Sequence, residues 1–264
     1  LDSSVVVEMK IDGTEVRRVE APGLYHAFTD MPDGTIAYPR HWSTNWDDDP
    51  GPDGEVVVLL HPDGTQTDLF DCDAWLRNRP ERPDVCGANT LSYDAATDRF
   101  LYSLFTVDTA LELDASTGVA TRWFGHLPDA YTFDPPDSAF WYQHGPVYLD
   151  DGRLLVSTHR AEDTTDLVVR EYEVDESAGT LRETASYGVA PEEPGRQMGE
   201  AHRLPGGNTL HNYGTHALLR EFAPDGAVVW DVRWEDEEYT WVGHQIGRSA
   251  PVAGDLYRFA SPRR

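Results

Sequence analysis

The chain has 264 residues and 39% of them are hydrophobic, which is enough to bury one substantial core. No run of about 18 apolar residues occurs, so we expect no segment to span a membrane. The formal net charge is −26, and Lys10 is the only lysine. This acidity argues against a nucleic-acid partner, since such binding needs a basic surface. Two explanations stay open: adaptation to salt, or a solubility requirement combined with a coding bias toward arginine.

Tight turns recur along the chain and separate short apolar runs. One family of turns comprises Asp12-Gly13, Asp63-Gly64, Asp114 to Gly118, Asp175 to Gly179 and Asp225-Gly226. A second family alternates with it and comprises Asp33-Gly34, Asp94 to Asp98, Asp151-Gly152, Gly206-Gly207 and Gly254-Asp255. Successive members of one family lie about 50 to 60 residues apart, so each repeat contains two hairpins.

Each repeat therefore predicts four antiparallel strands, and five repeats can be counted. They run from Val5 to Trp42, Glu55 to Phe105, Ala110 to Arg160, Leu167 to Gly214 and His216 to Phe259. Such units in series predict an all-β fold, a single β-propeller domain over residues 1–264. A two-sheet sandwich is the competing fold, but it would not explain five similar units. Helical periodicity is nearly absent, apart from one short turn expected at Ala74 to Asn78.

The repeats leave the number of blades open. Either the ring has five blades, or the chain lacks part of a six-bladed ring. Val5 to Val7 could also complete the last blade and close the ring.

The linker from Asn45 to Glu55 is the most acidic part of the chain. It contains four aspartates, namely Asp47, Asp48, Asp49 and Asp53. Clustered carboxylates can bind calcium, but this spacing does not match a calcium-binding loop and two prolines interrupt it. We therefore predict a solvated acidic turn and no metal site.

Cys72 and Cys86 are the only cysteines, and they lie in the loop-like segment DCDAWLRNRPERPDVCG. Two thiols alone make a poor metal site, because structural zinc needs four ligands. In an exported protein the pair would form a disulfide that stabilises the fold by about 3 kcal/mol. Two unpaired cysteines are the alternative.

The repeats bring histidines to equivalent positions. Alignment of the units on their second turns superimposes His26, Gly87, His144, Gly199 and, in less certain register, His244. The far end of the same hairpins supplies Arg40, His41, His159, Arg160, His211, Tyr213 and His216, and His202 lies on the strand before His211. In a propeller, the strand after each interblade crossing lines the central channel. A single histidine is more often a hydrogen-bonded structural residue, and His61 and His126 look like ordinary turn residues.

A channel that holds histidine and arginine in an acidic protein suits an oxyanion. Arginine offers a bidentate fork to sulfate or phosphate, and imidazole can act as a nucleophile or a general acid. Aromatic side chains near these positions could stack on an aromatic ring: Phe140, Trp141, Tyr142, Tyr213 and Trp241.

Several segments resemble the bacterial and archaeal arylsulfotransferase family. The segment LPGGNTLHNYGTHALLREFAPDGAVVWD resembles the LPNGNTL-type hairpin of that family and the strand pair after it. Further matches are ANTLSYD from Ala88, YQHG from Tyr142 and REYEVDESAGTL from Arg170. The resemblance extends from about Val85 to Phe259 and rests on the order and spacing of the motifs.

The resemblance implies a periplasmic or extracellular six-bladed propeller that transfers a sulfuryl group between phenols without a cofactor. Its reaction passes through a sulfated histidine. His216 matches the nucleophile, while His144 and Arg160 match the residues that bind the sulfate group. We expect the substrate to contact His26, Asn89, Tyr142, His202, Tyr213 and His244. An exported chain beginning at Leu1 would have lost a leader or an anchor, and the sequence leaves open which.

One position departs from the family pattern. Where the family has a histidine two residues before an asparagine, this chain reads Gly87-Ala88-Asn89. The alternative function is therefore a non-catalytic exported propeller that serves as a binding platform for a ligand or a protein.

Overall fold

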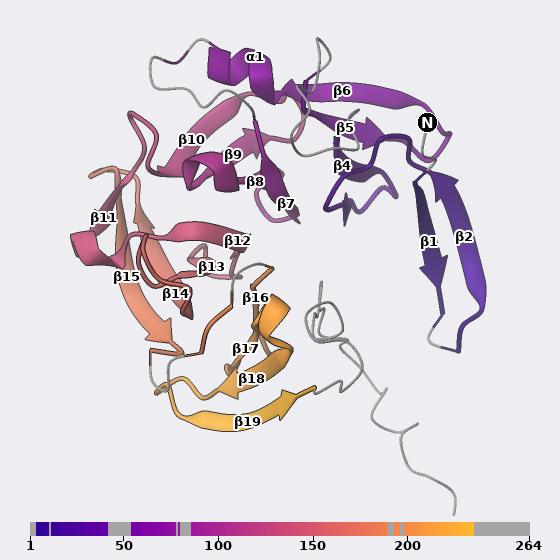
Figure 1. Ribbon diagram of the computed structural model, residues 1–264. Coiled ribbons are helices and arrows are strands. Elements are labelled where there is room, and N and C mark those ends of the chain that lie inside the picture. Colours follow the sequence, from indigo (N-terminus) through magenta and orange to yellow (C-terminus); the bar gives the residue numbers. More distant parts are fainter. Residues whose placement is uncertain are drawn as a thin grey trace, which may run out of the picture.

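The structure is a computed structural model, and it describes residues 4–10, 12–41, 54–77, 79, 86–189, 193–195 and 198–234. The described residues form four sheets of four or five strands, antiparallel except for one edge strand, and one separate hairpin. Figure 1 shows the sheets arranged around a common centre, with β7, β12 and β16 nearest to it. The prediction of an all-β propeller is confirmed.

The strands follow one another from the centre outward in each sheet. The separate hairpin consists of β1 (Val5–Met9) and β2 (Glu15–Glu20). Sheet 1 consists of β3 (Thr29–Asp30), β4 (Ile36–Arg40), β5 (Val56–Leu60) and β6 (Gln66–Asp71). Sheet 2 consists of β7 (Ala88–Asp94), β8 (Arg99–Leu104), β9 (Thr109–Asp114) and β10 (Ala120–Gly125).

The remaining two sheets complete the described fold. Sheet 3 consists of β12 (Trp141–Tyr148), β13 (Leu154–His159), β14 (Leu167–Asp175), β15 (Thr180–Tyr187) and, beyond β15, the parallel strand β11 (Thr132–Asp134). Sheet 4 consists of β16 (Glu200–Arg203), β17 (Thr209–Asn212), β18 (Leu218–Phe222) and β19 (Val228–Arg233).

The middle strands are buried on both faces, which explains their continuous apolar runs. All five residues of β5, VVVLL, are buried, and so are all six residues of β13, LLVSTH. Successive side chains of β4 pack into different hydrophobic cores. Tyr38 packs toward the β1–β2 hairpin, while Ala37 packs toward sheet 2. Each core therefore lies between two neighbouring sheets and holds them together.

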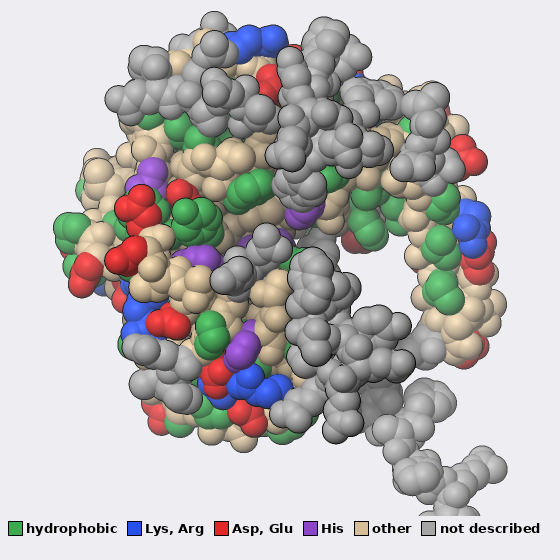
Figure 2. Space-filling model, viewed as in Figure 1, with side chains coloured by type: hydrophobic (Ala, Val, Ile, Leu, Met, Phe, Trp, Pro, Cys, Tyr) green, Lys and Arg blue, Asp and Glu red, His purple; other side chains and the backbone are tan. Residues whose placement is uncertain are grey.

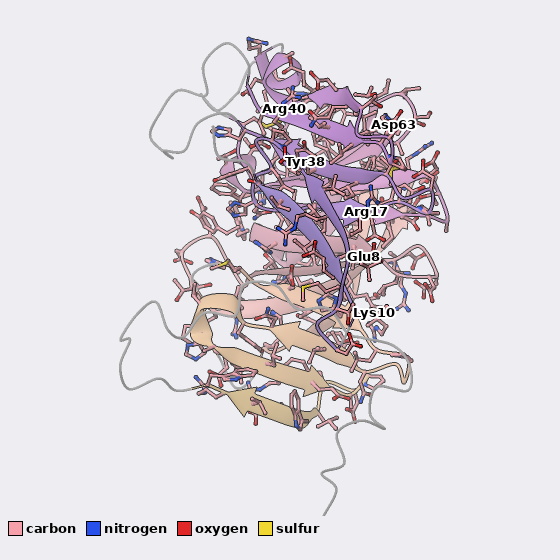
Figure 3. All side chains as sticks on the ribbon, turned by 90° about the vertical axis from the view of Figure 1, so that its right-hand side faces the viewer. Glu8, Lys10, Arg17, Tyr38, Arg40 and Asp63 are labelled. Carbon is pink, nitrogen blue, oxygen red and sulfur yellow. A yellow bond between two sulfur atoms is a disulfide. The ribbon has the colours of Figure 1, made fainter. Side chains whose placement is uncertain are left out.

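The predicted repeat boundaries are wrong by half a unit. Sheet 1 combines the second hairpin of the first repeat with the first hairpin of the second repeat, and the later sheets follow the same rule. The β1–β2 hairpin is accordingly an outer pair of strands. Figure 3 shows it alongside sheet 1, where the Arg17 guanidinium donates a hydrogen bond to the Gly34 carbonyl at 3.3 Å. The second hairpin expected near Gly254 lies outside the described residues, so the number of blades stays a prediction.

The cysteine segment contains the α-helix of the described structure. Helix α1 (Cys72–Arg77) begins where the Asp71 carboxylate accepts a hydrogen bond from the Ala74 amide at 2.7 Å. Cys72 and Cys86 form a disulfide, as predicted. No helix in the described part of the chain is long and apolar enough to cross a membrane. The acidic residues Asp47, Asp48, Asp49 and Asp53 lie outside the described residues.

Candidate functional site

Most of the predicted site residues lie at one end of the sheets, which we call the entry end. The innermost strands β7, β12 and β16 begin there, and the second strands β8, β13 and β17 end there. Predicted site residues at this end are Asn89, Tyr142, His144, Arg160, Tyr213 and His216. Figure 2 shows histidine side chains between the sheets, and one beside acidic and basic side chains over sheet 4.

His144 lies where three sheets meet. It pairs with Ser157 across β12 and β13, and its side chain is almost completely buried. The Ser157 hydroxyl lies 2.9 Å from His211 Nε2 on sheet 4. The amide of the next residue, Gly145, donates to the Thr90 hydroxyl of sheet 2 at 3.2 Å. His144 therefore lies on β12, the innermost strand of sheet 3.

Asn89 and Gln143 connect sheets 2 and 3. The Asn89 side chain donates to the Gln143 carbonyl at 2.7 Å. The Gln143 amide group donates to Ser103 Oγ and to the carbonyls of Leu104 and Thr109, each at 3.1 Å. Gln143 is completely buried, so it fixes the start of β12 and with it the backbone of His144.

Tyr142 and Arg160 lie on the more exposed side of the entry end. Tyr142 adopts a φ of 48°, and its amide donates to the Asp108 carboxylate. The residue is 48% exposed, and its ring centroid lies 5.0 Å from that of His159. Arg160 donates to the Val189 carbonyl at 2.8 Å.

His216 belongs to a charged network in sheet 4. It ends the 3-10 turn η4 (Gly214–His216), and its side chain is 27% exposed. Its Nε2 lies 3.0 Å from Glu193 Oε2 and 2.6 Å from Arg233 Nη1. Arg233 Nη2 also donates to Glu193 Oε2 at 2.8 Å, and Arg220 Nη2 donates to Glu193 Oε1 at 2.9 Å. Glu193 is therefore the common partner of one imidazole and two guanidinium groups.

The network keeps Glu193 ionised. Burial raises the pKa of this carboxyl group, but the hydrogen bonds and positive charges of Arg233 and Arg220 outweigh burial and hold the pKa below its usual value. A carboxylate therefore faces His216 at neutral pH.

The segment that carries Glu193 joins sheets 3 and 4. Its backbone carbonyl accepts from the Leu167 amide at 3.0 Å, and Gly195 donates to the Thr165 carbonyl at 2.7 Å. Val189, just before this segment, accepts from Arg160. Val189 thus contacts Arg160, and Glu193 contacts His216.

Tyr213 and His211 are completely buried between sheets 3 and 4. Their rings lie 4.0 Å apart. Burial, followed by the charges of Arg220 and His202, lowers the pKa of His211 to about 3, so this imidazole is neutral in the folded protein. Tyr213 has a place in the core in this conformation, rather than an open face for a substrate.

The remaining predicted residues are dispersed. His26 is exposed, and its ring contacts that of Tyr25 in a tilted arrangement, with 4.8 Å between the ring centroids. His202 lies on β16 with its Nε2 3.8 Å from Glu200 Oε2. It also lines a cavity of 680 Å³ near the turns after β12 and β16, at the end opposite the entry end. His244 lies outside the described residues.

Gly87 has no room for a side chain. A Cβ atom there would lie 2.5 Å from the Thr106 methyl group and 3.1 Å from Phe105 Cε1. Gly199, another position of the repeat alignment, is similarly constrained, because its Cβ would lie 2.2 Å from Ser157 Oγ. Side-chain contacts thus occupy the space that a histidine would need at both positions.

Sequence reasoning missed Glu193, Gln143, Arg220 and Arg233. Gln143 directly precedes His144 in the motif YQHG, so the sequence itself indicates that Gln143 lies near the site. Glu193 lies in the segment APEEPGRQ after Val189, which has no regular periodicity, so no sequence pattern marks it. Arg220 lies on the same face of β18 as Leu218 and Phe222, two residues from each. This spacing indicates an inward-facing side chain but does not indicate its partner.

Comparison with known proteins supports the fold and leaves the family open. No protein-family model matches the chain, and no curated protein matches it. The chain is similar to a solved protein of unknown function from Bacteroides caccae, with a TM-score of 0.52 and 16% identity over 85% of this chain and 73% of that one. It is also similar to a protein from Lactobacillus plantarum, with a TM-score of 0.51 and 16% identity over 85% of this chain and 61% of that one.

A third similar structure is virginiamycin B lyase from Staphylococcus aureus. It has a TM-score of 0.50 and 10% identity over 89% of this chain. This chain spans 61% of the length of the lyase. Such low identity supports the propeller fold alone.

Proposed function

We propose that the protein is an arylsulfotransferase-like enzyme that moves a sulfuryl group from an aryl sulfate ester to a phenol. The observation that carries this proposal is the environment of His216. This imidazole is partly exposed, faces the Glu193 carboxylate and contacts Arg233, while Arg220 binds the same carboxylate. A nucleophilic histidine needs a positioning carboxylate, and an oxyanion substrate needs nearby positive charge.

The three predicted catalytic residues take distinct roles in this reaction. The His216 imidazole attacks sulfur, a nitrogen–sulfur bond forms, and the bond from sulfur to the aryl oxygen breaks with its electron pair. Arg160 and His144 stabilise the negative charge on the remaining sulfate oxygens. An acceptor phenol then takes the sulfuryl group and restores the imidazole. No cofactor takes part.

The substrate is a small phenolic compound or its sulfate ester. Tyr142 supports this class, because its exposed ring offers a stacking surface at the entry end. The disulfide Cys72–Cys86 supports an exported, periplasmic or extracellular location, since disulfides persist in oxidising compartments.

The direct test is detection of the sulfated histidine. The protein incubated with 4-nitrophenyl sulfate alone should gain the mass of one SO3 on the peptide that contains His216. The adduct should persist in mild base and disappear in acid, because N–sulfated imidazole is acid-labile. His216→Ala should abolish it, whereas His61→Ala should retain it, since the His61 side chain hydrogen-bonds to Thr67 beside the β5–β6 turn of sheet 1, away from His216. An adduct that survives His216→Ala but is lost in His144→Ala would reverse the two assignments.

One observation favours a second function, that of a non-catalytic binding platform. Gly87 replaces a family histidine, and Phe105 and Thr106 leave no space for one. Under this alternative, 4-nitrophenyl sulfate would bind without forming an adduct on any histidine, and His216→Ala would leave binding unchanged. Isothermal calorimetry and mass spectrometry on the same samples separate the two functions.

A further inference from the structure

Two groups of opposite hydrogen-bonding character contact one nitrogen of His216. Glu193 Oε2 lies 3.0 Å from Nε2 and can only accept a hydrogen bond, because the carboxylate is ionised. Arg233 Nη1 lies 2.6 Å from the same nitrogen and can only donate. Among the described residues, no hydrogen bond reaches the other ring nitrogen, Nδ1.

A neutral imidazole satisfies only one of these partners at a time. With the proton on Nε2, it donates to Glu193 and leaves an electron pair on Nδ1. With the proton on Nδ1, Nε2 accepts from Arg233, and no electron pair remains for attack on a substrate. The tautomer of His216 therefore decides whether the residue can act as a nucleophile.

We propose that Glu193 is a positioning residue that holds the proton of His216 on Nε2, so that Nδ1 is the nitrogen that accepts the sulfuryl group. Arg233 competes for Nε2 and slows the reaction. This inference rests on the sulfuryl transfer proposed above, and it names a residue and a ring nitrogen that the transfer alone does not specify.

Glu193 and Arg233 compete for Nε2 of His216, and Glu193 is held more firmly in place than Arg233. Arg220, whose side chain is only 6% exposed, binds Glu193 Oε1 and leaves Oε2 directed at His216. The Glu193 backbone is fixed by Leu167, and the next residue, Pro194, forms a bridge with Asp166. Arg233 lies on the outermost strand of sheet 4, and its side chain is 38% exposed, so it is held less firmly.

The chemical step balances with these residues. The electron pair of Nδ1 forms the bond to sulfur, and the bond between sulfur and the aryl oxygen breaks, which releases an aryl oxide that takes a proton from water. The ring then carries positive charge, and the Nε2 proton shared with the Glu193 carboxylate stabilises that charge. In the second half, an acceptor phenol loses its proton to water, its oxygen attacks sulfur, and the nitrogen–sulfur pair returns to Nδ1.

The tautomer can be measured without any substrate. In protein labelled with 15N-histidine, long-range 1H–15N correlation distinguishes a protonated Nε2 from a protonated Nδ1, and His216→Ala assigns the signal. We expect the Nε2–H form to predominate in the wild-type protein and the Nδ1–H form in Glu193→Gln. Arg233→Met should increase the Nε2–H population. A wild-type protein in the Nδ1–H form, or a tautomer unchanged in Glu193→Gln, would overturn the proposal.

Adduct formation supplies the second readout. The rate of sulfation by 4-nitrophenyl sulfate should fall about 10- to 100-fold in Glu193→Gln and recover in part in Glu193→Asp. Arg233→Met should accelerate it, and Arg182→Met, which removes an exposed ion pair with Glu173, should leave it unchanged. A merely structural network would instead slow the reaction in both the Glu193 and the Arg233 variants. Correlation spectra of the adduct should place sulfur on Nδ1, and sulfur on Nε2 would contradict us.

The two proposals fail in different ways. An Nε2–H tautomer that depends on Glu193, together with no adduct on any histidine, would reject sulfuryl transfer and retain Glu193 as the residue that positions His216. An adduct on His216 with a tautomer independent of Glu193 would retain sulfuryl transfer and reject Glu193 as the positioning residue.

Discussion

Glu55 carries a buried carboxyl group immediately before β5, and its protonation makes the interface between sheets 1 and 2 sensitive to pH. Its side chain accepts hydrogen bonds from the Tyr102 hydroxyl and, at 3.3 Å, from the Ala88 amide. Burial raises its pKa to about 8, the Ala88 amide opposes the increase, and the charge of Asp73 adds to it. Glu55 is therefore mostly protonated in the folded protein at neutral pH.

This carboxyl group should make the protein less stable as pH rises. Its folded pKa lies above its unfolded value of 4.5, so its stabilising effect is complete below pH 4.5 and is lost as pH rises toward 8. At pH 7 the loss amounts to about 3 kcal/mol of unfolding free energy. In Glu55→Gln this pH dependence should disappear. Urea unfolding of both proteins at several pH values from 5 to 8 measures the difference, and parallel curves would contradict the assignment.

The predicted site residues differ in how far the sequence could place them. His144 and Arg160 lie eight residues before and eight residues after Gly152, so alignment on this turn puts both at the end of their hairpin that lies away from the turn. Glu193 belongs to a linking segment whose direction depends on hydrogen bonds to Leu167 and Thr165, and such contacts have no local signature. The buried state of Tyr213 depends on packing between two sheets, which the hairpin pattern does not contain.

At the level of elements, the start of β7 depends on a close approach that only glycine permits. The Gly87 carbonyl accepts a hydrogen bond from the Phe105 amide at 3.0 Å, and the turn η2 (Phe105–Val107) lies against it. The hairpin β7–β8 is thus closed at the entry end by main-chain contact. A larger residue would have to displace η2.

Gly87→Ala should lower the unfolding free energy by about 1–3 kcal/mol, because the new methyl group would overlap the Thr106 side chain. Gly206→Ala is the matched control, since no atom lies within 4 Å of its Cβ position. Adding Thr106→Ser, which removes the methyl group in question, should restore part of the loss. Thermal unfolding of the three variants provides the measurement, and equal stabilities of Gly87→Ala and Gly206→Ala would refute the steric argument.

The sequence predicted nearly every hairpin but assigned them to the wrong sheets. Turn residues are local signals, so Asp63-Gly64 and Asp151-Gly152 marked their turns correctly. Whether two successive hairpins join one sheet depends on hydrogen bonds between them, such as those between β4 and β5. These two strands are separated in the sequence by the acidic linker, so no local pattern reports their pairing. The parallel strand β11 escaped prediction because its partner, β15, lies more than forty residues further along the chain.

For the whole molecule, the dominant electrostatic property is excess negative charge. Aspartate and glutamate number 47, against 21 lysine and arginine residues. Many arginines are already paired with carboxylates, as Arg122 is with Glu112 and Glu176, so the unpaired excess is acidic. Mutual repulsion among these carboxylates disfavours the compact state.

Salt should therefore stabilise the protein. Raising sodium chloride from about 0.01 M to about 1 M shortens the screening length from about 30 Å to about 3 Å, which removes most of the repulsion. Surface ion pairs also weaken, but each contributes little. We expect the Tm to rise by several degrees, and equally in potassium chloride. A Tm that falls with salt would mean that the paired charges outweigh the repulsion.

The half-unit offset between repeats and sheets has a consequence for how such a chain can change its length. A genetic deletion of one whole repeat removes the outer hairpin of one sheet together with the inner hairpin of the next sheet. An inner hairpin of the first sheet and an outer hairpin of the second sheet remain. They can pair as a hybrid sheet, since both keep the register set by their own turns. Recombination between repeats would then yield rings that differ by one blade, and every sheet in them would still contain both an inner and an outer hairpin.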